Sequence, residues 1–157
     1  MLKKYLICFL MSMVPMAELR VAVPMALGMD LPVLPAYAVC ILGNMLPVPI
    51  IYFFARKVLL WGADKKYIGK FFSYCLEKGE KAGRKLSKTA GRQGLVLALM
   101  LFVGIPIPGT GAWTGTLGAS FLNMGFKSTV AAVSLGVVIA GIIMGLGSGA
   151  LFTFIGL

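Results

Sequence analysis

Two ionisable residues, Glu18 and Arg20, lie inside an otherwise apolar stretch over residues 12–28. Charged side chains in an apolar segment are costly unless they pair or face water, and they usually serve a function. We expect Pro15 and Pro24 to break the helix between them, which would let both side chains point into a polar cavity. Glu18 could then take up a proton while Arg20 holds an anion. The alternative is a structural ion pair, although residues two positions apart do not face each other on a regular helix.

A second polar set follows a turn rich in proline and glycine, Gly104-Ile-Pro-Ile-Pro-Gly-Thr-Gly111. Free backbone N–H groups at the start of a half-helix can bind an anion. We therefore expect a substrate or ion site at the residues of this turn and just after it, which are Gly109, Thr110, Gly111, Trp113 and Thr114. Trp113 could instead anchor the chain at a membrane interface. Asp30 is either a turn or helix-cap residue or a further coupling residue.

Several kinds of chemistry are excluded by composition. The chain has no histidine, so imidazole catalysis and histidine metal sites are excluded. The cysteines Cys8, Cys40 and Cys75 are isolated and indicate neither a disulfide framework nor a thiolate metal site. Because no nucleophile and base form a recognisable set, we expect no enzyme activity. We also expect no cofactor and no metal.

The overall composition is that of a membrane protein. Of the 157 residues 59% are hydrophobic and 13% charged, and the mean hydropathy is +0.94; a soluble domain carries about 25% charged residues. The net charge is +10, and most of it lies between Arg56 and Arg92. Basic loops between membrane spans face the cytoplasm and anionic lipid head groups. The composition therefore predicts a multi-pass protein whose basic segment contacts membrane lipids and not nucleic acid.

Two segments are long enough to cross a membrane, which needs roughly 20 helical residues. Residues 31–55 carry no charge, and Pro47 and Pro49 should bend or break the helix near its end. Residues 128–157 predict a final apolar helix. On one face of that helix the sequence places three glycines, which favour close packing within the chain or a dimer seam: Gly141, Gly145 and Gly149.

Residues 93–126 are also uncharged, but as one helix they would measure about 51 Å at 1.5 Å per residue. This exceeds the bilayer, so the helix must break at the Pro/Gly turn, where non-helical backbone is tolerated only inside protein or beside water. Over 64–78, apolar residues recur at helical spacing among lysines, which indicates a basic amphipathic helix at the membrane surface or an ordinary solvated helix. Residues 79–94 predict an irregular, glycine-punctuated connection.

The two ends of the chain share an order of features, namely a Pro-broken segment followed by a long apolar helix, with Gly43 corresponding to Gly136. We predict an all-α integral membrane protein of two inverted repeats, each a re-entrant hairpin plus a transmembrane helix. The first repeat covers residues 1–57, the basic cytoplasmic amphipathic linker covers 58–92, and the second repeat covers 93–157. The alternative is four full spans with both ends in the cytoplasm.

Two phrases, Pro15-Met-Ala-Glu-Leu-Arg-Val-Ala-Val-Pro24 and Ile105-Pro-Ile-Pro-Gly-Thr-Gly-Ala-Trp-Thr-Gly115, resemble the putative small multidrug export protein family. The layout is similar to that of the wider DedA-like (VTT/SNARE-associated) superfamily. That resemblance implies re-entrant hairpins and proton-driven translocation of undecaprenyl phosphate in a bacterial-type inner (plasma) membrane. It also implies two acidic residues twelve positions apart, which Glu18 and Asp30 match, and arginines around Pro108-Gly109, which this sequence lacks.

Residues and resemblance together predict a proton-coupled transporter of an amphiphilic anion such as a lipid phosphate, using Glu18, Arg20 and the backbone of residues 109–111. One alternative is a small multidrug exporter of lipophilic cations with Glu18 as the exchange site, which the neighbouring Arg20 disfavours by repulsion. Another is a membrane scaffold that transports nothing. Because few helices must enclose a polar site, we expect a homodimer.

Overall fold

The computed structural model describes residues 1–15, 17–65, 69–107 and 110–155, and for residues 59, 71–72, 75–76, 78–80, 82–83, 86–87 and 149–155 it describes the backbone only. Within these residues the fold is all-helical, as the sequence predicts. The helices are α1 (Leu2–Met13), α2 (Glu18–Gly28), α3 (Val33–Met45), α4 (Pro47–Ala63), α5 (Gly69–Gly104), α6 (Ala112–Phe121) and α7 (Phe126–Ile155).

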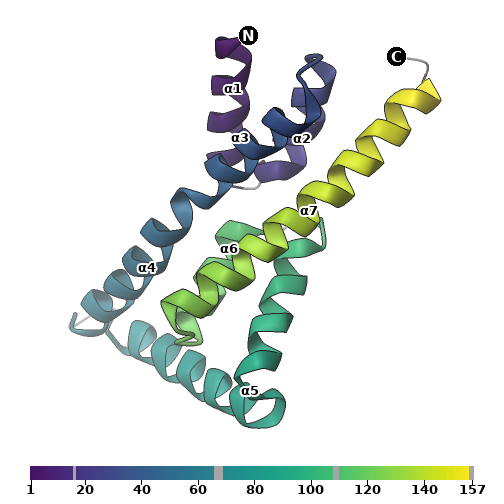
Figure 1. Cartoon of the computed structure of the whole chain (residues 1–157). Helices are drawn as coiled ribbons and strands as arrows, with labels where there is room; N and C mark the ends of the chain where they lie inside the picture. The colour runs from purple at the N-terminus through teal and green to yellow at the C-terminus, as the bar shows by residue number, and fades with distance from the viewer. Residues whose placement is uncertain (16, 66–68, 108–109, 156–157) are drawn as a thin grey trace.

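The first helical hairpin consists of α1 and α2, which pack together and run in opposite directions (Figure 1). α1 ends where Val14 adopts an extended conformation, because the residue before a proline disfavours helical angles. α2 begins at Glu18 and continues through Pro24. The expected break from Pro15 to Pro24 is therefore wrong in its extent, since Pro24 lies inside a helix. The first helix ends at Met13 and the second begins at Glu18.

The second hairpin consists of the last part of α5 and α6, which also run in opposite directions (Figure 1). α5 ends at Gly104 and α6 begins at Ala112, which confirms that the uncharged stretch 93–126 is interrupted at its Pro/Gly turn. Pro106 lies in the non-helical connection, whereas residues 108–109 lie outside the described residues.

Two long segments, Val33–Ala63 and Phe126–Ser148, are long and apolar enough to cross a membrane. The first contains both α3 and α4. Leu46 between them keeps helical angles (φ −62°, ψ −40°), and Pro47 occupies the first position of α4, where its missing N–H is tolerated. Pro47 therefore divides the segment into two helices without turning the chain away from its direction (Figure 1).

Tyr37 of α3 fills the space that two glycines leave on α7. Its hydroxyl donates to Gly141 O at 2.6 Å, and a Cβ at Gly145 would lie 1.2 Å from the same hydroxyl oxygen. Gly141 and Gly145 thus serve packing within the chain, one of the two roles predicted for them. The side-chain surroundings of Gly149 lie outside the described residues.

The second helix of each hairpin, α2 or α6, ends in the same local structure. Shortly after each helix one residue has a left-handed backbone, Asp30 with φ 58° after α2 and Asn123 with φ 55° after α6. In both halves its N–H bonds to the carbonyl three residues back, and the next N–H bonds to the carbonyl five residues back, which is a Schellman C-cap. These bonds are Asp30 N to Leu27 O (3.0 Å) and Leu31 N to Ala26 O (3.2 Å), then Asn123 N to Ser120 O (3.2 Å) and Met124 N to Ala119 O (3.0 Å).

Gly43 and Gly136, which correspond in the sequence, also make equivalent contacts. A Cβ at Gly43 would lie 2.6 Å from Phe9 O on α1, and a Cβ at Gly136 would lie 2.7 Å from Met100 O on α5. Each glycine therefore lets a long helix approach the first arm of the hairpin in its own half.

α5 differs from its prediction. It is helical from Gly69 to Gly104 with a single kink at Gly91 (φ 69°, ψ 173°), so the irregular connection expected over 79–94 is helical on both sides of the kink. The amphipathic helix expected over 64–78 is helical from Gly69, whereas residues 66–68 lie outside the described residues. On its exposed surface Glu77 pairs with Lys81, and the hydrogen bond and charge of Lys81 lower the pKa of Glu77.

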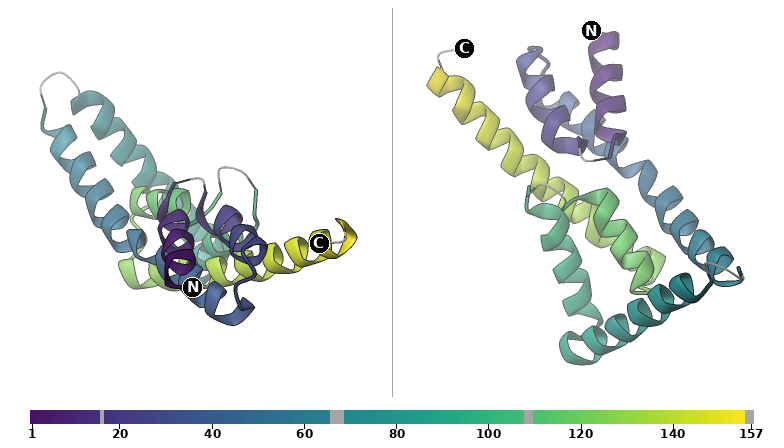
Figure 2. Two further views of the ribbon diagram at one scale, coloured as in Figure 1. Left: turned by 90° about the horizontal axis from the view of Figure 1, so that it is seen from above. Right: turned by 180° about the vertical axis from the view of Figure 1, so that it is seen from behind.

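The start of α1 and the end of α7 lie at one end of the molecule, and the basic first part of α5 lies at the opposite end (Figures 1 and 2). The connections of the two hairpins come together between them, and hydrogen bonds join α2 to the start of α6 there. We call this meeting point the hairpin junction.

Candidate functional site

Glu18 lies at the centre of the hairpin junction. Its side chain is 5% exposed and reaches the first turn of α6. Oε2 accepts a hydrogen bond from Ala112 N at 3.3 Å, and Oε1 accepts one from Trp113 N at 3.1 Å. The N-terminus of a helix carries a partial positive charge and unpaired N–H groups, so the α6 dipole compensates the buried carboxylate.

Gly111 makes this approach possible. A Cβ at this position would lie 2.1 Å from Glu18 Oε2, and the backbone φ of 155° is one that side-chain-bearing residues rarely adopt. Glu18 itself has a left-handed backbone with φ 46°. Unusual backbone angles on both sides of one contact, where the surrounding fold holds them, are characteristic of functional sites.

Arg20 has a partner of its own. Its Nη2 donates to Thr110 Oγ1 at 2.8 Å, and that hydroxyl lies 2.7 Å from Ile105 O and 2.8 Å from Ile107 O, to either of which it can donate. In the part of the chain that the structure describes, Glu18 and Arg20 do not form an ion pair with each other. The two charges are therefore held separately, each by the opposite hairpin.

Trp113 adds a third link between the hairpins, because its indole Nε1 donates to Met13 O at 3.1 Å. Met13 is the last residue of α1, so its carbonyl has no helical donor and accepts this bond instead. Thr114 is the next residue of α6 and is exposed, and its Oγ1 lies 3.5 Å from Gly111 O.

The structure thus brings together five of the predicted site residues, namely Glu18, Arg20, Thr110, Gly111 and Trp113, with Thr114 beside them. Gly109 lies outside the described residues. Asp30 is exposed and follows the other end of α2, about 15 Å from Glu18 by the helical rise. It forms the C-cap described above and does not join this group.

Sequence reasoning expected backbone donors at the start of α6 but missed that Glu18 itself accepts their hydrogen bonds. It also missed Met13 O, because a backbone carbonyl carries no side-chain signal and only the three-dimensional fold reveals it. Two buried polar atoms, Asn44 Oδ1 and Thr116 Oγ1, have no hydrogen-bond partner in the described part of the chain. Such atoms usually bind ordered water.

The anion position at the start of α6 is therefore occupied, not free as the sequence suggested. Any other anion that uses these donors must displace the Glu18 carboxylate, and protonation of Glu18 would weaken its hold because charge-assisted hydrogen bonds are about twice as strong as neutral ones. Arg20 is held near the same helix N-terminus by its hydrogen bond to Thr110. The arrangement is suited to an exchange between a carboxylate, a proton and an external anion.

Comparisons with known proteins agree with the membrane-like helices. No match was found among curated proteins or among solved structures. The model of one protein family, described as "Putative small multi-drug export protein", matches residues 18–143. The matched range begins at Glu18 and includes Arg20, Thr110, Gly111 and Trp113 of the junction. The match covers most of the chain, and the protein therefore belongs to the putative small multi-drug export protein family.

Proposed function

We propose that the protein is a membrane transporter that moves an amphiphilic anion together with a proton through the hairpin junction. The observation that carries this proposal is the buried Glu18 carboxylate on the N-terminus of α6, with Arg20 on the adjacent turn. An amphiphile fits because the sequence neighbours of Glu18 and Arg20 are apolar, and a lipid phosphate of the undecaprenyl phosphate kind is one member of this class.

The cycle follows from competition for one set of donors. Deprotonated Glu18 binds the N–H groups of Ala112 and Trp113 and keeps the two hairpins together. When Glu18 is protonated, this bond weakens, and the anionic head group of the substrate takes its place between the α6 N-terminus and Arg20. Proton and anion are then bound at the same time, so they cross in the same direction, and loss of the proton returns Glu18 to α6.

The proposed topology has two inverted repeats, with each hairpin re-entrant. Its support is the matching C-caps at Asp30 and Asn123 and the matching contacts of Gly43 and Gly136. Two hairpins that enter from opposite faces and meet at their tips would bring non-helical backbone to membrane depth only where protein surrounds it. With this topology we also propose the DedA-like likeness, an inner membrane, a cytoplasmic basic segment over 58–92 and a homodimer that encloses the junction.

Transport can be tested with purified protein in liposomes. The probes are two fluorescent amphiphiles with the same isoprenyl tail, one with a phosphate head group and one with a trimethylammonium head group. We expect the wild-type protein to move the phosphate probe between leaflets, measured by its access to an external quencher. We expect Glu18→Gln to lose this activity while it elutes as a folded protein.

A second candidate is export of lipophilic cations, which the family description favours. An apolar cavity of about 320 Å³ lies between α4 and α6 and is lined by Trp113, Leu117 and Phe54, among others. Such a cavity could hold a flat lipophilic ring, and its lining residue Trp113 donates its backbone N–H to Glu18. Movement of the trimethylammonium probe alone would select this candidate. Movement of neither probe by folded protein would contradict transport of these classes and favour a membrane scaffold.

A further inference from the structure

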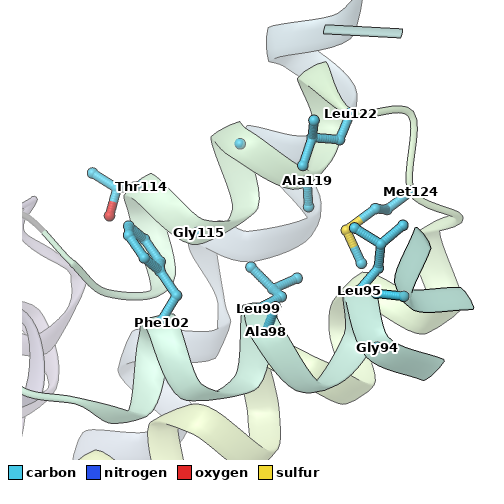
Figure 3. Close-up of a pocket in the computed structure, with 12 residues that line it drawn as sticks. Gly94, Leu95, Ala98, Leu99, Phe102, Thr114, Gly115, Ala119, Leu122 and Met124 are labelled. Carbon is cyan, nitrogen blue, oxygen red and sulfur yellow. The ribbon is translucent and has the colours of Figure 1, made fainter. Parts of the chain in front are cut away.

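An apolar groove of about 320 Å³ lies between the second part of α5 and α6, on the hairpin that carries the junction (Figure 3). Leu95, Leu99 and Phe102 of α5 form one wall, and Ala119 and Leu122 of α6 form the other. Of the residues that line it, Thr114 is the one with a polar side chain. Apart from Thr114, the groove therefore presents apolar side chains and suits an apolar molecule along its length.

Glycine creates the groove. Gly115 brings the two helices together, because a Cβ there would lie 2.6 Å from Val103 Cγ2. One turn later, Gly118 lines the groove, and a Cβ there would meet nothing within 4 Å. The missing side chain at position 118 is therefore not filled by the protein itself. An empty groove of this kind loses dispersion contacts along its walls, and in a bilayer the available filler is a lipid chain.

A cation, Arg92, lies beside residues that line the groove. In the sequence it falls between Ala90 and Gly94, which both line the groove, directly after the kink at Gly91. Its guanidinium donates to Ser128 Oγ at 3.2 Å and lies 3.2 Å from the position of a Cβ at Gly125, the residue after groove-lining Met124. Arg92 is exposed, so the guanidinium has donors left for a second partner.

We propose that this groove binds one acyl chain of an anionic phospholipid whose phosphate contacts Arg92. An apolar channel with an exposed guanidinium at its end is complementary to a molecule with an alkyl chain and an anionic head. The site uses neither Glu18 nor Arg20 and lies beyond the proposed transport function. A bound lipid here would brace α6 against α5 behind the junction.

The site can be tested with full-length protein in vesicles that contain phosphatidylglycerol with a photoreactive group in its acyl chain. Phosphatidylcholine with the same chain serves as the reference lipid. We expect cross-links on peptides of α5 and α6 that line the groove, with about fivefold more from phosphatidylglycerol, since one arginine near a head group contributes about 1 kcal/mol. Arg92→Gln should remove this preference between the lipids.

Gly118→Phe should place its ring in the groove, because a Cβ there meets nothing within 4 Å, and abolish the cross-links. Gly147→Phe is the matched control, because a Cβ at Gly147 also meets nothing within 4 Å and this residue lies on α7, away from the groove. Equal labelling by both lipids, or groove labelling unchanged in Gly118→Phe, would overturn the proposal. A change of oligomeric state in Gly118→Phe but not in Gly147→Phe would also overturn it, because it would make a second copy of the chain the occupant.

Discussion

Glu18 and Arg20 are two residues apart, yet each is held by a different part of the second hairpin. Glu18 bonds to the N-terminus of α6, and Arg20 bonds to Thr110 in the preceding turn. A mutual ion pair would make each residue depend on the other, because loss of one leaves the second charge buried and unpaired. Separate partners remove that dependence, which a comparison of single and double variants can detect.

We predict that Glu18→Gln and Arg20→Ala destabilise the protein independently. Glu18→Gln loses the interaction of its charge with the α6 dipole, up to about 2 kcal/mol in a partly buried site. Arg20→Ala loses a charged hydrogen bond, about 1.5–3 kcal/mol. The double variant should show the sum of both losses within about 0.5 kcal/mol in thermal unfolding in detergent. A double variant more stable than either single variant would instead indicate a coupled pair.

The glycine beside Glu18 gives a second residue-scale prediction. Gly111→Ala should lower the unfolding temperature, because its Cβ overlaps the Glu18 carboxylate and its φ of 155° adds about 1–3 kcal/mol of strain. The control is Gly118→Ala, a helical position with open space around the new Cβ, where stability should rise by up to about 1 kcal/mol. Similar effects in the two variants would show that residue 111 does not hold Glu18 in place.

At the scale of elements, two equivalent helix contacts should respond alike to one added methyl group. Gly43→Ala drives a Cβ against Phe9 O, and Gly136→Ala drives one against Met100 O. A backbone carbonyl cannot rotate away, so each change should cost about 1–3 kcal/mol, measured as a lower unfolding temperature.

Gly147→Ala, on an open surface of α7, is the control for this pair and should be neutral or stabilising. Tolerance of alanine at position 43 but not at position 136 would contradict the equivalence of the two halves.

Local chemistry predicted some elements and failed for others. The break between α5 and α6 was predictable, because Pro106 removes a backbone donor and an uninterrupted helix would be too long. Pro24 inside α2 was not, because packing of α2 against α1 and α3 outweighs the cost of one proline. The helix through residues 79–90 was also missed, since glycine lowers helix propensity without preventing a helix.

The junction shows the same division. The types of its residues, a carboxylate, a guanidinium and a Pro/Gly turn, were recognisable from the sequence. Their partners were not, because Glu18 and Ala112 are 94 positions apart and one of the two groups is backbone. Only the fold reveals that the helix N-terminus is occupied by the chain itself.

At the scale of the whole molecule, the start of α1 and the end of α7 lie opposite the basic part of α5 (Figure 1). In a membrane with this segment in the cytoplasm, the re-entrant arrangement puts both ends outside. In a cysteine-free background, Leu2→Cys should react with an impermeant maleimide on intact cells, and Thr89→Cys should react only after permeabilisation. Both positions are exposed. Labelling of both positions only after permeabilisation would support four full spans instead.

The central claim is that Glu18 couples proton movement to the movement of an amphiphilic anion, and proton flux tests it most directly. An alkyl sulfate, which stays charged at all relevant pH values, is added outside proteoliposomes that contain a pH-sensitive dye. Wild-type protein should acidify the lumen, because proton and anion enter together, and folded Glu18→Gln should give no more acidification than liposomes without protein. Equal acidification by wild type and Glu18→Gln would contradict the account.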